Sequence, residues 1–196
     1  TRPYRRAAEP FDYVAEARKE GSTIVQSFHE QMTRQGGRMH AIMRDVVAFA
    51  NTNGGTIYVG ASPNTRVPIR GLDKPEEAMA ELRAEIERLV TPPIEVSISV
   101  VRSEGKSVLA VAVPKGKDVP YALEGANIYL RQEAETSLAM RDEIVSLIAR
   151  ALAQREAPEV APAEAAPEEV AETPAAEPAR EARATQPRRR GGRRPA

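Results

Sequence analysis

Residues 46–60 read VVAFANTNGGTIYVG, and this stretch decides the fold of the chain. Apolar side chains before and within it recur at helical spacing: Met39, Ile42, Met43, Val46 and Val47. Asparagine and glycine then tolerate the positive φ that ends a helix, and the β-branched TIYV run favours a strand. The stretch therefore predicts a helix, a tight turn and a strand in direct succession. The expected turn residues are Asn51, Asn53, Gly54 and Gly55.

The flanking segments extend this pattern to the order αβαβαβββα. Helices are expected over residues 10–20, 39–50, 73–89 and 137–155, and strands over 22–29, 56–60, 94–100, 108–113 and 127–131. Asp73 is expected to cap the third helix, because Pro75 and Glu76 follow it as they do at a helix N-terminus. The prediction is an α/β (α+β) fold within residues 1–155, in which helices cover a mixed β-sheet.

Five motifs follow one another in a distinctive order. After NTNGGTIYVG come IRGL at 69–72, a helix that runs into Pro92-Pro93, KSVLAVAV at 106–113, and Pro120-Tyr121 with IYLR at 128–131. This order resembles the Schlafen-type, Alba-like family of DNA-binding domains. The resemblance covers roughly residues 20–150, and it implies an Alba-like fold and a nucleic-acid partner.

Bulk composition excludes several classes of protein. The 196 residues include 28 basic and 28 acidic side chains, so any nucleic-acid surface must arise from local segregation of charge. Cysteine is absent and there are two histidines, which argues against disulfides and against thiolate or histidine-rich metal sites. No apolar run approaches the ~20 residues that span a bilayer. We expect a cytoplasmic protein without a cofactor or a bound metal.

The composition changes sharply near Glu156. From there to Ala196 the chain is mostly Ala, Pro, Glu and Arg, and such a segment buries too little apolar surface to offset its ordering entropy. We expect residues 156–196 to form a disordered tail with an Arg/Gly-rich tip. The tip arginines are Arg188, Arg189, Arg190, Arg193 and Arg194.

The residues argue against an enzyme. Some Schlafen relatives cut RNA with three carboxylates that position a metal ion, but the resemblance places Gly21, Gln26 and Asn64 at those positions. The expected glycine turn follows a helix, where carbonyl groups point, whereas phosphate loops use the N–H groups at a helix start. His29 and His40 belong to no recognisable catalytic set. A divergent metal-dependent nuclease and an ATP-binding protein remain as alternatives.

Nucleic-acid binding without catalysis is the favoured interpretation. Loop cations at one edge of the sheet are expected to contact DNA or RNA phosphates: Arg66, Arg70, Lys115, Lys117 and Arg131. The chain has eight aromatic residues, mostly in apolar patterns, so we expect little base readout. The family resemblance implies a regulatory, for example transcriptional, role. The alternative from another class is a protein-interaction or oligomerisation module that forms a homo-oligomer.

Overall fold

The computed structural model describes residues 11–156 of the chain, and the expected tail with its tip arginines lies outside them. A short 3-10 turn at Gln35–Gly37 precedes the second helix. The elements in chain order are α1 (Tyr13–Glu20), β1 (Gln26–His29), α2 (Arg38–Asn51), β2 (Gly55–Val59), α3 (Pro75–Leu89), β3 (Val90–Thr91), β4 (Ser97–Ser103), β5 (Lys106–Val113), β6 (Ala122–Leu123), β7 (Tyr129–Gln132), β8 (Glu135–Leu138) and α4 (Arg141–Glu156).

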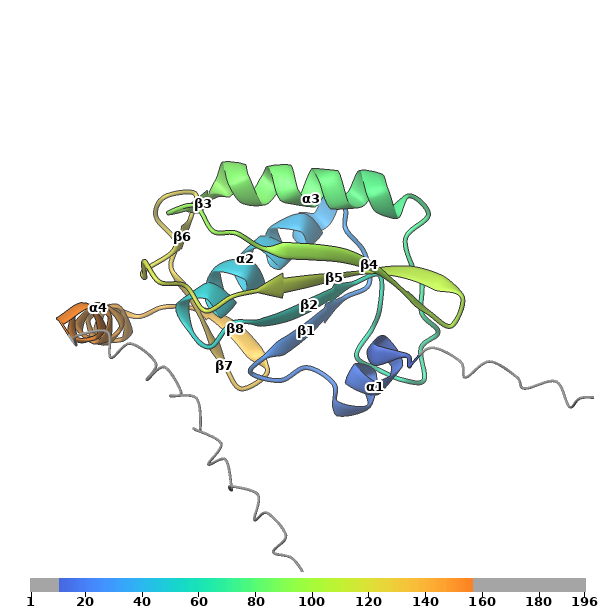
Figure 1. Ribbon diagram of the computed structural model, residues 1–196, viewed down its shortest axis with the longest axis horizontal. Coiled ribbons are helices and arrows are strands. Elements are labelled where there is room, and N and C mark those ends of the chain that lie inside the picture. Colours follow the sequence, from blue (N-terminus) through green and yellow to red (C-terminus); the bar gives the residue numbers. More distant parts are fainter. Residues whose placement is uncertain (1–10, 157–196) are drawn as a thin grey trace, which may run out of the picture. The chain divides into compact units, whose positions relative to one another are not determined.

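A four-stranded sheet in the order β1-β2-β5-β4 forms the centre of the fold (Figure 1). β1 pairs in parallel with β2, while the β2–β5 and β4–β5 pairs are antiparallel, so the sheet is mixed. Ile57 lies opposite Val111, and Val59 opposite Leu109. Two further pairs, β3 with β6 and β7 with β8, form small separate sheets. The predicted α/β (α+β) class with a mixed sheet is confirmed.

The main core lies between this sheet and helices α2 and α3. Figure 1 shows α3 above the strands and α1 below them. The predicted stripe of α2 is buried, and Phe49 closes it with no exposed surface. Ile57, Leu109 and Val111 meet this stripe from the sheet because side chains alternate along a strand. Burial of each such side chain contributes about 1.5–3 kcal/mol, so this layer supplies most of the driving force for folding.

A second, smaller apolar cluster lies on the opposite face of the sheet, where α1 covers it. Val14 of α1 packs there with Phe28, Ile69 and Val108. Arg18 anchors the same helix to the loop that follows β2, because its guanidinium donates to three backbone carbonyls. Nε donates to Ser62 O at 2.9 Å, and Nη2 donates to Asn64 O at 2.8 Å and to Val67 O.

Several element boundaries differ from the prediction. β1 begins at Gln26, four residues later than expected, and α3 begins at Pro75 with Lys74, not Asp73, at its N-cap. The strands β3, β6 and β8 were not expected. Residues 137 and 138, predicted as helix, belong to β8 because they pair with β7. The last helix therefore begins at Arg141.

None of the helices in residues 11–156 is both long and apolar enough to cross a membrane.

Candidate functional site

The side chain of Asn51, the last residue of α2, clamps two distant segments of the chain. Its Nδ2 donates to Tyr121 O at 2.8 Å and to Tyr129 O at 3.0 Å, while its Oδ1 accepts from Tyr121 N at 2.7 Å. Asn51 is only 4% exposed, so these bonds are shielded from water. Asn51 is a buried connector at the end of α2 and has no positive φ.

Gly54 is the one residue of the expected turn that has a positive φ, at 74°. A Cβ atom there would lie 2.8 Å from both Lys115 N and Val113 O. Gly116 N donates to Ala50 O at 2.8 Å, which fixes the β5–β6 loop to the end of α2 from the other side. The turn therefore positions the loop that carries Lys115 and Lys117. Asn53 and Gly55 do not have the positive φ that we expected.

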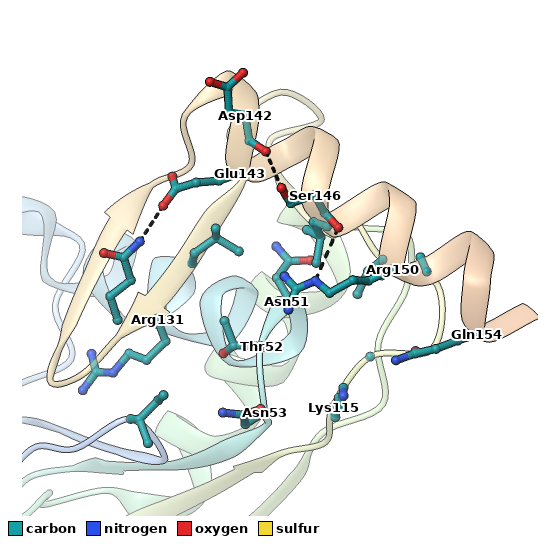
Figure 2. Close-up of a pocket in the computed structure, with 17 residues that line it drawn as sticks. Asn51, Thr52, Asn53, Lys115, Arg131, Asp142, Glu143, Ser146, Arg150 and Gln154 are labelled. Carbon is teal, nitrogen blue, oxygen red and sulfur yellow. Dashed lines mark hydrogen bonds between the residues drawn. The ribbon is translucent and has the colours of Figure 1, made fainter.

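A hollow of about 520 Å³ lies beside this turn, under α4 (Figure 2). Polar side chains line it from several elements, among them Asn53 in the turn, Lys115 in the β5–β6 loop, and Arg150 with Gln154 on α4. Apolar side chains line the rest of the wall, with Leu147 of α4 among them. No sequence pattern indicates this hollow, because its walls come from segments far apart in the chain, α4 among them.

The predicted loop cations lie at two separate places. Arg66 and Arg70 follow the end of β2, whereas Lys115 and Lys117 lie beside its beginning. β2 has five residues and thus separates the two pairs by about 16 Å. All four side chains are exposed, and within residues 11–156 none of them takes part in an ion pair.

Residues 23–140 match the family model described as Schlafen, AlbA_2. The chain belongs to the Schlafen, AlbA_2 family.

Two solved structures are similar to this Schlafen, AlbA_2 domain at low sequence identity. The crystal structure of the DIP2311 protein from Corynebacterium diphtheriae is 21% identical with a TM-score of 0.48. The match covers 62% of this chain and 26% of that one, so this chain spans about a quarter of that protein's length. A solution NMR structure shows the N-terminal domain of a protein related to the ATP-dependent DNA helicase RecG, from Nitrosomonas europaea. It is 17% identical with a TM-score of 0.47, over 67% of this chain and 94% of that one. No curated protein matches the chain.

Arg131 of this Schlafen, AlbA_2 domain does not belong to an exposed phosphate-binding edge. Its side chain is 3% exposed, and its guanidinium donates to Thr23 O at 2.9 Å, Gln26 O at 3.0 Å and Thr136 Oγ1 at 3.1 Å. The guanidinium also lies over the Phe49 ring, 5.1 Å from its centroid. Burial lowers the pKa of Arg131, partly offset by the charge of Asp45. Figure 2 shows its guanidinium pointing away from Lys115 and Arg150, so Arg131 holds β7 to the start of β1.

A buried polar cluster continues from Arg131 and was not predicted. His29 Nε2 lies 2.8 Å from Asp45 Oδ2, Thr136 Oγ1 donates to Asp45 Oδ1 at 2.7 Å, and Arg131 Nη1 lies 3.8 Å from the same oxygen. Burial raises the pKa of Asp45, but the hydrogen bond and charge of His29 and the hydrogen bond of the Thr136 hydroxyl together lower it by more. The pKa of Asp45 therefore lies below its usual value. The cluster joins β1, α2 and β8 in the interior.

The residues that the sequence resemblance places at the family's carboxylate positions form structural hydrogen bonds in this domain. The Gln26 amide donates to Gly21 O at 2.6 Å and to Ala17 O at 3.1 Å, and Asn64 Oδ1 accepts from Arg66 N at 3.0 Å. Across residues 11–156, no group of three or more His, Cys, Asp or Glu side chains is arranged to hold a metal ion.

Proposed function

We propose that this protein binds nucleic acid without catalysis, by contacts to the phosphate backbone with little sequence readout, in a transcriptional or other regulatory role. The observation that carries the proposal is a pair of exposed lysines, Lys115 and Lys117, on a loop fixed by Gly54 and Gly116. Neither lysine forms an ion pair within residues 11–156. A cation that already has a carboxylate partner gains less from a phosphate, so unpaired cations on a fixed loop are the better candidates. DNA and RNA are both candidate partners.

Arg66 and Arg70 offer a second, weaker contact. A ligand that reaches both pairs of cations has to run along the sheet for the length of β2, about 16 Å, which a duplex or an extended single strand can do. Little sequence readout is expected because Phe49 and Tyr121 are buried and Phe28 stacks on Tyr58, with ring centroids 5.1 Å apart. These rings are therefore not presented beside the cations for base stacking.

Salt-dependent binding tests this proposal. Fluorescence anisotropy would measure the binding of short labelled DNA and RNA to the full chain, with the five tip arginines replaced by serine so that these cations do not contribute. The double charge reversal Lys115→Glu/Lys117→Glu should weaken binding to all sequences alike. It should also reduce the slope of log K against log salt concentration by about two, because each phosphate contact contributes about one unit.

A matched control makes the same change in net charge elsewhere. Lys19→Glu/Lys74→Glu replaces two exposed lysines that pair with Glu16 and Glu77 within α1 and at the start of α3. The control should keep the native slope. Equal losses in both double variants would show a nonspecific charge effect, and a native chain without affinity at low salt would overturn the proposal.

A second candidate function is self-association, and one observation favours it. α4 buries Leu147 and Ala151, yet Val145, Ile148 and Leu152 on another face are 53%, 39% and 54% exposed. Their spacing places them in one stripe, and an exposed apolar stripe is typical of an interaction surface. Sedimentation over a range of concentrations would test a dimer of this chain. If the mass of the native protein rises with concentration, Ile148→Glu should hold it at the monomer value. A native mass that stays at the monomer value would refute self-association.

A further inference from the structure

The hollow under α4 has hydrogen-bond donors gathered at one end. Figure 2 shows Lys115, Arg150 and Gln154 on one side of the hollow, with Asn53 close by. Arg150 Nε donates to Ser146 O at 3.3 Å, and no carboxylate within residues 11–156 pairs with Arg150 or Lys115. Two cations and two amides from three separate parts of the chain thus face a common space. That end of the hollow suits an anion such as a phosphate group.

The other end of the hollow has the opposite character. Glu143 lines it, and both of its carboxylate oxygens are held in place: Oε1 accepts from Gln132 Nε2 at 2.5 Å and Oε2 from Met140 N at 2.7 Å. A carboxylate has about four lone-pair sites, so Glu143 can still accept hydrogen bonds from a ligand. Glu143 and Arg150 are two helical turns apart, about 10 Å along α4.

Apolar side chains line the wall between these ends. Leu130 and Leu147 are nearly buried, and Val119 is half-buried. A planar or aliphatic group can lie against them without leaving polar atoms unpaired. The hollow is therefore complementary to a ligand with an anion at one end, an apolar middle and hydrogen-bond donors at the other end.

The nearby C-terminal end of α2 does not repel such an anion strongly. Helix C-termini carry partial negative charge on carbonyl groups that lack partners. Here Ala48 O accepts from Thr52 Oγ1 at 2.7 Å, Phe49 O from Gly54 N at 2.8 Å, and Ala50 O from Gly116 N at 2.8 Å. Three of the last four carbonyls of α2 are thus occupied within the protein.

We propose that the hollow binds one nucleoside phosphate. The phosphate lies at Lys115 and Arg150, the sugar and base lie along the apolar wall, and a base amino group or sugar hydroxyl donates to Glu143. This proposal deepens the proposed function: the nucleotide belongs either to a single strand, whose base leaves the stack to enter the hollow, or to the free mononucleotide pool. The donors are side chains, so no glycine-rich phosphate loop is involved.

Ligand titrations of the full-length protein test this assignment. NMR shift changes or calorimetry would compare adenosine 5′-monophosphate with inorganic phosphate and with adenosine. The mononucleotide should bind, and the two fragments should bind at least tenfold more weakly, because each reaches only one end of the hollow. Equal affinity for inorganic phosphate and the mononucleotide would reduce the site to a general anion contact and overturn the proposal.

A filling variant and its control locate the site without changing charge. Ser146→Trp places a large side chain in the hollow, whereas Ala149→Trp adds the same group on an exposed part of α4 that does not line it. Ser146→Trp should abolish mononucleotide binding, and Ala149→Trp should retain it. If the first variant does not fold, Arg150→Gln should weaken binding about tenfold or more, while Arg141→Gln, which pairs with Asp142, should not.

Oligonucleotides distinguish the two sources of the nucleotide and separate this proposal from the previous one. If the source is a strand, oligoadenylate should bind more tightly than a duplex, and Ser146→Trp should remove that preference while the salt-dependent duplex affinity of Lys115 and Lys117 persists. If the source is the free pool, mononucleotide binding should respond to Ser146→Trp and strand preference should be absent. If Ser146→Trp changes neither mononucleotide binding nor strand binding, the nucleotide site in the hollow is refuted, while the proposed contact to the phosphate backbone is not affected.

Discussion

Replacement of Asn51 by alanine should destabilise the whole domain, although Asn51 lies directly before a surface turn. The variant removes three hydrogen bonds and leaves Tyr121 N–H, Tyr121 O and Tyr129 O without their partner. A buried polar group without a partner costs about 1–3 kcal/mol, and a carbonyl is at the lower end because an under-satisfied carbonyl is tolerated better than an orphaned N–H group. We expect a loss of about 3–5 kcal/mol in the free energy of unfolding.

Urea unfolding followed by circular dichroism would measure this loss, together with a fall in melting temperature of roughly 10 °C. Asn53→Ala is the matched control, because Asn53 is exposed two residues away and should cost less than about 0.5 kcal/mol. If Asn51→Ala stays within about 1 kcal/mol of the native protein, the clamp does not hold the loop of Tyr121 and the strand of Tyr129 to α2. The positions inferred for Lys115 and the hollow would then lose their support.

Three further predictions concern other parts of the protein. Gly54→Ala should lower the free energy of urea unfolding by at least about 3 kcal/mol, because a Cβ at φ 74° would meet two backbone atoms at 2.8 Å. The control Gly105→Ala has a φ of 73° and open space around it, so it should cost only about 1 kcal/mol, and equal costs would mean that the close approach to Lys115 N is unimportant. The pKa of Asp45 lies below its usual value, so its carboxylate should stabilise the fold above about pH 4 and lose that effect as the pH falls through the folded-state pKa. Unfolding at a series of pH values would measure the stability difference between the native protein and Asp45→Asn. This difference should shrink on acidification, and a constant difference would contradict the linkage. Purified protein should leave RNA and DNA intact with Mg²⁺ or Mn²⁺, because Gly21, Gln26 and Asn64 offer no carboxylate; cleavage that persists through repurification and gel analysis would show an unrecognised metal site.

The sequence predicted local structure well where one element determines its own pattern. The stripe of α2 and the strand at 55–59 follow from apolar spacing and β-branched residues, and both were confirmed. The β7–β8 hairpin was missed because its turn includes Glu133 with a φ of 50°, a residue that normally favours helix and carries no turn signal. A helix was predicted from residue 137 because Leu138 continues the apolar spacing of the helix that follows.

The candidate site was less predictable, because its important contacts join residues far apart in the chain. Asn51 reads as a turn residue, and its partners at Tyr121 and Tyr129 lie 70 and 78 residues away. The sequence indicates an exposed cation at a strand end for Arg131, but its guanidinium is buried and donates to carbonyls 105 and 108 residues away. No local pattern distinguishes a surface arginine from one that bonds two distant carbonyls. Arg150 was likewise missed, since its role depends on where α4 lies.

The small apolar cluster under α1 has a practical consequence for recombinant production. The family match begins at residue 23, so a fragment cut to residues 23–140 would lack Val14 and Arg18. Phe28, Ile69 and Val108 would then face solvent, and the loop of Arg66 would lose the carbonyl bonds that Arg18 provides. Such a fragment should express mainly as inclusion bodies, and a gene truncated for crystallisation or NMR should start no later than Phe11.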